Sequence, residues 1–280
     1  MIDSVKDLQS KNRQHIDSET ARQDLAIPDS FSLIKHKYLV TSNKRGVGKT
    51  SLAANLAITL STREVKVGLI DLDLLGKDIL KILGFKRSSY EIDEDERFIP
   101  KSFSDHLKVI SIKPIIKDVD QAVIWKADSK ARVIRQIVAD IDWGKLDFLI
   151  VNSPPGTGNE SFAVTQVMHG AKAIFISTTE KEPLPQITEL IKFYQTAQIP
   201  ILGVIENMSG FICKDCDRTG GSTYREAIIM EINYLGRIPI DPHMADYVLS
   251  DQSFLEKYPD SQAKHGYEIV VDKIIKDSRS

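Results

Sequence analysis

The sequence predicts an α/β fold in which a mostly parallel sheet is covered by helices on both faces. From Lys37 onward, apolar runs of strand length alternate with stretches of helix length. Strands that consist of nearly continuous apolar runs are typical of parallel sheets buried on both faces. In addition, the glycine-rich stretch "GVGKTS" follows the first apolar run and opens the first helical stretch, which is the arrangement of a phosphate-binding loop.

The first elements are expected around this loop. The first strand covers residues 37–42, "KYLVTS". The helix after it covers 47–63, because apolar residues recur there at helical spacing, at Leu52, Ala53, Leu56 and Leu60. The second strand covers 66–73, "KVGLIDLD", and a short helix at 77–84 ends at a glycine. The acidic segment 85–105 lacks both periodicities, so we expect an irregular loop there.

The remaining elements follow from the same alternation. Apolar runs predict strands at 107–112, 146–152, 171–178 and 201–207, with a last edge strand at 234–240. Amphipathic stretches predict helices at 127–141, 184–197 and 262–277. In such sheets ligands bind beyond the carboxyl ends of the strands, so the residues that follow each strand are the candidates for a site.

Composition sets limits on the class of protein. The chain has 280 residues, 42% of them hydrophobic, and a net charge of -2, so a general nucleic-acid binder is not expected. No apolar run approaches the length of a membrane span, and the N-terminus lacks the apolar centre of a secretory signal. We therefore expect a cytoplasmic protein without a membrane partner. Residues 1–35 are polar and are expected to form an N-terminal arm, followed by a nucleotide-binding α/β domain at 36–280.

The stretch "SNKRGVGKTS" (42–51) has the residues that cradle phosphate. Backbone N–H groups of the loop would bind phosphate oxygens, Lys49 would reach the β- and γ-phosphates, and the Thr50 hydroxyl would ligate Mg²⁺. Asparagine stands where the common pattern begins with glycine, and asparagine tolerates unusual backbone angles. The residues expected to contact ATP here are Asn43, Arg45, Gly46, Val47, Gly48, Lys49, Thr50 and Ser51.

A second lysine, Lys44, precedes Lys49 by five residues. With it, the loop resembles the deviant phosphate loop of the MinD/ParA/Mrp group of dimeric ATPases, which implies the phosphate-loop NTPase fold of the SIMIBI type. The resemblance implies that Lys44 reaches across a homodimer interface to the partner's nucleotide and takes part in catalysis. Arg45 replaces a glycine of that group, and its side chain either contacts phosphate or obstructs the partner subunit.

Two carboxylates end the second strand. Asp71 and Asp73 lie at i and i+2, so their side chains point to the same face. The stretch resembles the "D-A-D-x-x-G-P-S" run of the Mrp family. That resemblance implies that Asp73 orients the attacking water and that Asp71 lies near the Mg²⁺ ion. The family's Pro-Ser is Lys77-Asp78 here, so this loop differs from the pattern.

The segment "VNSPPGTGN" (151–159) resembles the Mrp run "V-D-x-P-P-G-T-G-D", with its central Pro-Pro-Gly-Thr-Gly intact. The two acidic positions of that run are Asn152 and Asn159 here, and an amide adds no negative charge for the metal. We therefore expect weak Mg²⁺ retention and slow ATP hydrolysis. By the same resemblance, which covers most of residues 37–245, Asn207 contacts the adenine and Pro239 closes over the base.

The chain has only two cysteines, Cys213 and Cys216, in an insertion near 211–222. A structural zinc site or a 4Fe–4S cluster needs four donors, which a symmetric dimer supplies and one chain does not. The pair resembles the C-x-x-C of Mrp-type carriers, which holds a labile 4Fe–4S cluster that bridges two subunits. A shared zinc ion, a redox pair and an unmetallated site are the alternatives.

Three functions are compatible with these patterns. The first is an ATP-binding iron–sulfur cluster carrier that acts as a homodimer and delivers its cluster to apo-proteins. The second is a positioning ATPase of the MinD/ParA sort, with the helix at 262–277 as a membrane-surface helix. The third is a nucleotide-binding regulator that does not hydrolyse ATP, an alternative that depends on Arg45, Asn152 and Asn159.

Overall fold

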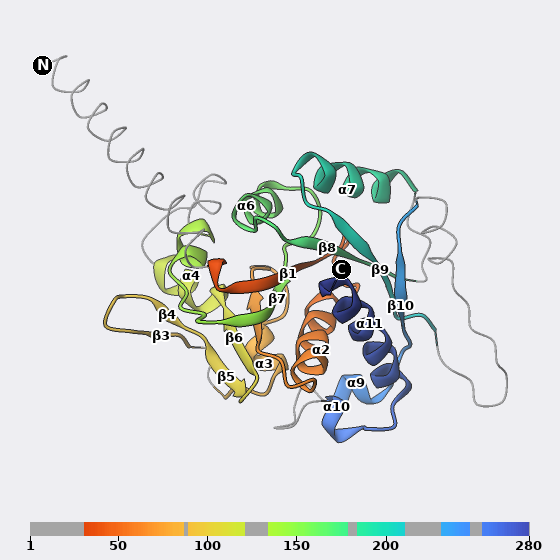
Figure 1. Ribbon diagram of the computed structural model, residues 1–280, viewed down its shortest axis with the longest axis horizontal. Coiled ribbons are helices and arrows are strands. Elements are labelled where there is room, and N and C mark those ends of the chain that lie inside the picture. The colour runs from red at the N-terminus through yellow and green to blue at the C-terminus, as the bar shows by residue number, and fades with distance from the viewer. Residues whose placement is uncertain are drawn as a thin grey trace, which may run out of the picture.

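The computed structural model describes residues 31–86, 89–120, 134–178, 184–210, 231–246 and 254–279. Its centre is an eight-stranded sheet in the order β10-β9-β8-β1-β7-β2-β6-β5, parallel throughout except for β5, which runs antiparallel to β6 (Figure 1). The strands are β1 (Ile34–Thr41), β2 (Val67–Asp71), β5 (Lys101–Ser104), β6 (Leu107–Ser111), β7 (Leu146–Asn152), β8 (Lys172–Thr178), β9 (Ile201–Asn207) and β10 (Tyr234–Ile238). The predicted mostly parallel sheet is confirmed.

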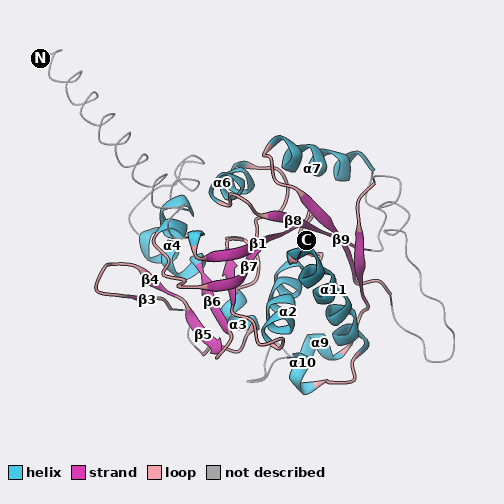
Figure 2. Cartoon of the chain, viewed as in Figure 1, coloured by secondary structure: helices cyan, strands magenta, loops and turns pink. Residues whose placement is uncertain are grey.

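Helices cover both faces of this sheet, as expected (Figure 2). One face packs against α2 (Lys49–Ser61), α3 (Ile79–Ile82), α10 (Phe254–Lys257) and α11 (Gln262–Ser278). The other face packs against α4 (Ile112–Asp120), α6 (Asn159–Val167), α7 (Leu184–Thr196) and a helical stretch at 134–139. Alternate residues of the central strands enter the two cores: Val40 belongs to the first and Leu39 to the second.

Strand β1 begins earlier than predicted. It starts at Ile34, and Phe31 just before it is only 5% exposed, so the boundary expected between 35 and 36 falls inside a strand. The first half of β1 mixes buried and exposed positions, "IKHK", and this polar composition concealed it. Residues 1–30 of the predicted arm, part of the helix expected at 127–141 and the cysteine-bearing insertion lie outside the described residues.

The acidic segment predicted as an irregular loop contains three short strands. β3 (Glu91–Ile92) and β4 (Phe98–Ile99) form an antiparallel hairpin, and β5 extends the main sheet along β6. Strand β5 is a half-exposed edge strand of sequence "KSFS", so it has no apolar run that would reveal it. Four short helices were also not predicted: α4, α6, α9 (His243–Asp246) and α10.

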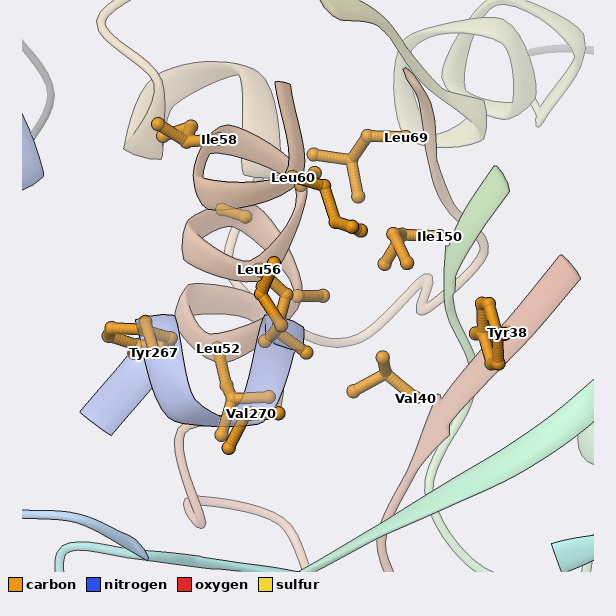
Figure 3. Packing of buried hydrophobic residues seen from close by; sticks show 14 of the residues in the cluster. Tyr38, Val40, Leu52, Leu56, Ile58, Leu60, Leu69, Ile150, Tyr267 and Val270 are labelled. Carbon is orange, nitrogen blue, oxygen red and sulfur yellow. The ribbon is translucent and has the colours of Figure 1, made fainter. Parts of the chain in front are cut away.

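The C-terminal helix α11 packs against α2 and the edge strand β10. Figure 3 shows α2 between the strands that carry Tyr38 and Ile150 and the part of α11 that carries Tyr267 and Val270. Most apolar side chains of α11, among them Tyr267, Val270 and Ile274, are therefore buried in the first core, whereas Ile269 is 42% exposed. This contradicts the interpretation of 262–277 as a membrane-surface helix, since its apolar face is already occupied by the protein. Within the part of the chain that the structure describes, no helix is long and apolar enough to span a bilayer.

Candidate functional site

The site lies where the carboxyl ends of β1, β7, β2 and β6 meet. In the sheet register, Asn152 of β7 is adjacent to Val40 of β1 and to Asp71 of β2, and Asp71 is adjacent to Ser111 of β6. The phosphate loop connects β1 to α2 above these strand ends. It borders a cavity of about 320 Å³. The N-terminus of α2 opens into this cavity, and its free backbone N–H groups favour an anion there.

The glycines of the loop are required by its backbone. Gly46 and Gly48 have φ angles of +83° and +80°, a region that favours glycine. A Cβ atom at Gly48 would lie 2.5 Å from Asn207 Nδ2, whereas a Cβ at Gly46 would meet nothing within 4 Å. Asn207 Nδ2 donates a hydrogen bond of 2.8 Å to the carbonyl of Val47. The end of β9 thus holds the loop from behind.

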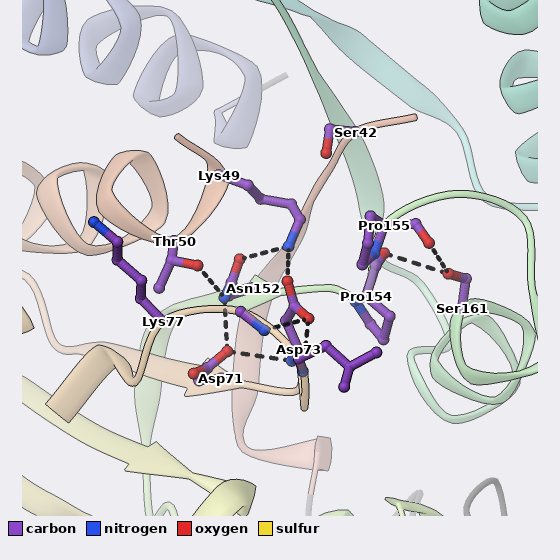
Figure 4. A network of polar contacts seen from close by, with 12 residues as sticks. Ser42, Lys49, Thr50, Asp71, Asp73, Lys77, Asn152, Pro154, Pro155 and Ser161 are labelled. Carbon is purple, nitrogen blue, oxygen red and sulfur yellow. Dashed lines mark hydrogen bonds and ion pairs between the residues drawn. The ribbon is translucent and has the colours of Figure 1, made fainter. Parts of the chain in front are cut away.

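A buried polar network forms the floor of the cavity (Figure 4). Lys49 Nζ lies 2.6 Å from Asp73 Oδ2 and donates a longer bond of 3.3 Å to Asn152 Oδ1. The amide Nδ2 of Asn152 donates to Thr50 Oγ1 at 3.3 Å and to Asp71 Oδ1 at 2.6 Å. Asn152 therefore connects the two lines of contact, one from the loop lysine and one from the buried carboxylate. An aspartate at this position would have no hydrogen to donate.

The lysine of the loop is strongly buried. Burial lowers the pKa of Lys49 from its ordinary value, and the ion pair with Asp73 opposes this change. An ammonium group in such a place needs a partner of opposite charge. Asp73 supplies that charge, and phosphate oxygens carry a negative charge that could pair with Lys49 in the same way.

Asp71 lies beneath this floor and is fully buried. Its Oδ2 accepts from Lys113 Nζ at 3.0 Å, and its Oδ1 accepts from Asn152 and from the backbone N–H of Asp73. Burial raises the pKa of Asp71, and the charge of Lys113 is the main effect that opposes the rise.

The residues present fit a Mg²⁺ ion only in part. Thr50 and Asp73 line the cavity, and a hydroxyl and a carboxylate are oxygen ligands of the kind that Mg²⁺ prefers. Asp71 does not line the cavity, and both of its oxygens already accept hydrogen bonds. Within the described ranges, no cluster of three or more histidine, cysteine, aspartate or glutamate side chains could hold a metal.

Most of the residues expected from the sequence lie together. The cavity is lined by Lys44, Arg45, Gly46, Gly48, Lys49, Thr50, Ser51 and Asp73. The side chain of Val47 instead points into the first core. Pro239 lines a different depression with Tyr258, while Asn207 contacts the loop from behind. The contacts of Asn207 and Pro239 with the base remain predictions, as does the role of Cys213 and Cys216, which lie outside the described residues.

Sequence reasoning did not find Lys113, nor the cavity residues Leu75, Gly76 and Met208. It placed Lys77 and Pro155 in motifs of the nucleotide site but gave neither residue a role. A signal for Lys113 was available. It is the second residue after strand β6, at the edge of the sheet where ligands bind.

This geometry agrees with the comparisons to known proteins. Residues 33–275 match the ParA family model, described as NUBPL iron-transfer P-loop NTPase. The chain belongs to this family. The predicted Mrp-type resemblance, the phosphate-loop fold and nucleotide binding are therefore confirmed at the level of the family.

Two curated relatives match over most of their length. A cytosolic Fe-S cluster assembly factor NUBP1 homolog of Brugia malayi is 34% identical over 90% of this chain and 85% of its own length. The cytosolic Fe-S cluster assembly factor CFD1 of Kluyveromyces lactis is 33% identical over 90% of this chain and 93% of its own. Among solved structures, a nucleotide-binding protein of Archaeoglobus fulgidus in complex with ADP superposes with a TM-score of 0.71 and 26% identity. That match covers 84% of this chain and 93% of the other.

Proposed function

We propose that this protein is an ATP-binding carrier of iron–sulfur clusters that acts in the cytosol. The observation that carries the proposal is the match of residues 33–275 to an iron-transfer NTPase family, because that span includes both the phosphate loop and the only two cysteines of the chain. The relatives named as cytosolic Fe-S cluster assembly factors support the same cargo and the same compartment. The recipients would be apo iron–sulfur proteins.

The cysteine count supports a homodimer as the working unit. A 4Fe–4S cluster is commonly held by four thiolates, and each chain offers Cys213 and Cys216. Two chains related by a two-fold axis would supply all four ligands. Transfer would then be a ligand exchange, in which thiolates of the recipient replace those of the carrier at the iron atoms. Lys44, on the rim of the nucleotide cavity, is the residue proposed to reach the partner's nucleotide.

Nucleotide would act through the buried network. When ATP enters, its phosphates compete with Asp73 for the ammonium of Lys49, and Asp73 becomes available to orient a water molecule. Mg²⁺, when bound by Thr50 and Asp73, would neutralise phosphate charge. Asn152 carries no charge in this network, so we propose slow hydrolysis.

Anaerobic cluster reconstitution tests the proposal. Wild type would be compared with Cys213→Ser/Cys216→Ser and with the control Thr219→Ala/Ser222→Ala, which alters the same segment but leaves both thiols. We expect about four irons per dimer in wild type and control, with a visible absorption spectrum, and none in the cysteine variant. Iron counts, zinc counts and the mass of the complex would be recorded together.

The alternative results are equally informative. Zinc bound in place of iron, or no metal in any variant, would refute the carrier function. Iron bound by a monomer would refute the bridging arrangement but not the cargo.

A regulator that binds ATP without hydrolysing it is a second candidate, favoured by the amide at Asn152. Phosphate release by the reconstituted protein separates the two, because the regulator would release none above the background of a Lys49→Ala variant. The positioning-ATPase alternative has lost its best support, since most of the apolar face of α11 is buried against the rest of the protein.

A further inference from the structure

A second buried lysine stands beside the nucleotide site. Lys113 lies at the start of α4, directly after β6, and is 8% exposed. Its ammonium Nζ lies 3.0 Å from Asp71 Oδ2 and donates a bond of 2.6 Å to the carbonyl of Lys77. No part of the sequence interpretation gave this lysine a role.

Lys113 takes the position that a cation would need in order to reach Asp71. The other oxygen of Asp71 accepts from Asn152 Nδ2 and from the N–H of Asp73. Both oxygens are thus engaged by donors, and a positive charge is already in contact with one of them. A divalent cation next to Asp71 would have to displace this ammonium and tolerate its repulsion.

The buried polar network at and beneath the floor of the cavity is close to charge balance without metal. It contains two carboxylates, Asp71 and Asp73, and two ammonium groups, Lys49 and Lys113. Asn152 adds no charge between them. Phosphates that approach this network meet little net negative charge. One of the usual reasons for Mg²⁺ in a phosphate site, the shielding of phosphate from neighbouring carboxylates, is therefore weak here.

We propose that Lys113 is a built-in counter-ion that replaces a divalent cation at Asp71, so that this protein binds nucleoside triphosphate with little dependence on Mg²⁺. Lys113 does not touch the cavity, and it acts as a positioning residue through Asp71 and the Lys77 carbonyl. The bond to that carbonyl also holds the loop after β2, whose residues Leu75, Gly76 and Lys77 line the cavity. This inference rests on the nucleotide-binding part of the proposed function and not on the cluster.

Calorimetric titration with the non-hydrolysable analogue AMPPNP tests the inference, with Mg²⁺ and with EDTA, at pH 8.5. In wild type the dissociation constant should change less than about threefold when Mg²⁺ is removed. In Lys113→Met, Asp71 lacks its counter-ion, and removal of Mg²⁺ should weaken binding at least about tenfold. Lys113→Arg keeps the charge and should behave like wild type. Lys113→Met/Asp71→Asn removes both charges and should also lose the Mg²⁺ requirement.

The control is Lys145→Met, which neutralises an exposed lysine outside the site and should match wild type. A wild-type requirement for Mg²⁺ as large as that of Lys113→Met would overturn the proposal. If Lys113→Met does not fold, the wild-type titrations and the charge-free double variant still decide it. Absence of AMPPNP binding in both buffers would instead overturn the nucleotide site itself, so the two failures are distinguishable.

Discussion

Lys49 Nζ lies 2.6 Å from Asp73 Oδ2, and both side chains are less than a tenth exposed, at 6% and 8%. The residue expected to bind phosphate and the residue expected to orient water are therefore each other's partners. In the proposed mechanism, the phosphates of ATP would replace Asp73 as the partner of Lys49. This ion pair therefore links the stability of the protein to the arrangement of the groups expected to act on ATP.

Replacing Asp73 by asparagine separates these two roles. Lys49 would remain buried without a charged partner, so we expect the nucleotide-free protein to lose about 3 kcal/mol of stability. AMPPNP binding should be as tight as in wild type or tighter, because phosphate no longer competes with a carboxylate. Thermal melting with and without AMPPNP measures both effects. Asp95→Asn, in an exposed turn with a 79% exposed side chain, is the control. An unchanged melting temperature in the empty Asp73→Asn protein would contradict the pairing.

The two glycines of the loop provide a matched comparison. Both have φ near +80°, so alanine costs about 1 kcal/mol of backbone strain at either position. Only at Gly48 does the new Cβ also collide with Asn207 Nδ2, at 2.5 Å. We expect Gly48→Ala to weaken AMPPNP binding at least about tenfold more than Gly46→Ala does. Calorimetry measures this difference. The double variant Gly48→Ala/Asn207→Ala should regain part of the lost AMPPNP affinity. If Gly46→Ala and Gly48→Ala weaken AMPPNP binding equally, the collision with Asn207 is not the cause.

The amide of Asn152 gives a third prediction. In Asn152→Asp, two carboxylates would face each other where Nδ2 now lies 2.6 Å from Asp71 Oδ1. Like charges at this distance cannot both ionise without cost, so the melting temperature in EDTA should fall at neutral pH. Mg²⁺ should restore more stability than it does in wild type. Asn159→Asp is the control, because Asn159 is the other amide at an expected acidic position and is exposed at the start of α6. If Mg²⁺ stabilises Asn152→Asp and Asn159→Asp equally, the stabilisation does not arise from repulsion between residue 152 and Asp71.

The strands of the fold were largely predictable, and the reason is physical. Central strands such as β7 and β9 are buried on both faces, so their residues must be almost all apolar and the pattern is unmistakable. Strand β5 lies at the edge and half of its residues face solvent, so "KSFS" carries no comparable pattern. Helix α6 was missed for a related reason, since its sequence "NESFAVTQV" mixes polar and apolar residues.

The phosphate loop of the site could be predicted from the sequence, whereas the pairing of charged side chains beneath it could not. The phosphate loop is local in sequence, so spacing alone brings Gly48, Lys49 and Thr50 together. The contact of Lys113 with Asp71 joins residues 42 positions apart and depends on the pairing of β2 with β6. Sequence spacing cannot reveal such a contact until the order of the strands is known.

The fold itself offers a prediction about pH. Lys35 donates to Asp147 Oδ1 at 2.7 Å, and the N–H of Lys66 donates to Oδ2 at 2.9 Å, so one carboxylate ties β1 and the start of β2 to β7. The bond from Lys35, followed by that from Lys66, holds the pKa of Asp147 below its ordinary value of 3.8. Its contribution to stability is thus fully present above pH 3.8 and is lost as the pH falls through the lower folded-state pKa.

Asp147→Asn should therefore reduce stability at pH 7 by about 1 kcal/mol, a value that allows for solvent screening of Lys35. The difference in the free energy of unfolding between Asp147→Asn and wild type should shrink as the pH is lowered below 3.8. Urea unfolding at pH 7 and at successive acidic pH values measures it. Asp272→Asn removes a carboxylate that is 65% exposed, against 29% for Asp147, and that pairs with Arg63, so it should change stability less. If the stability difference between Asp147→Asn and wild type grows at acidic pH, the pKa of Asp147 is not lowered in the folded protein.

The proposed homodimer makes a prediction that mixing two inactive variants can test. Lys44→Ala would remove the lysine that acts on the partner's nucleotide, and Asp73→Asn would remove the group that orients water in its own site. Each variant alone should release phosphate at the background rate. In a mixed dimer, the site on the Lys44→Ala chain keeps its own Asp73 and receives Lys44 from its partner. With random exchange, half of the dimers are mixed and one of their two sites is complete, so about one quarter of the wild-type rate should return.

The measurement is phosphate release from the mixture, compared with each variant alone and with wild type diluted into Asp73→Asn. Arg45→Ala serves as a second reporter at the same rim of the cavity, where its side chain is exposed. If Arg45 obstructs the partner, its removal should raise the wild-type rate. If Arg45 contacts phosphate, its removal should lower it. Recovery in the Lys44→Ala and Asp73→Asn mixture requires that Lys44 acts across an interface. A mixture that stays at background, while wild type releases phosphate, would place Lys44 in its own site and remove the lysine as an argument for the dimer.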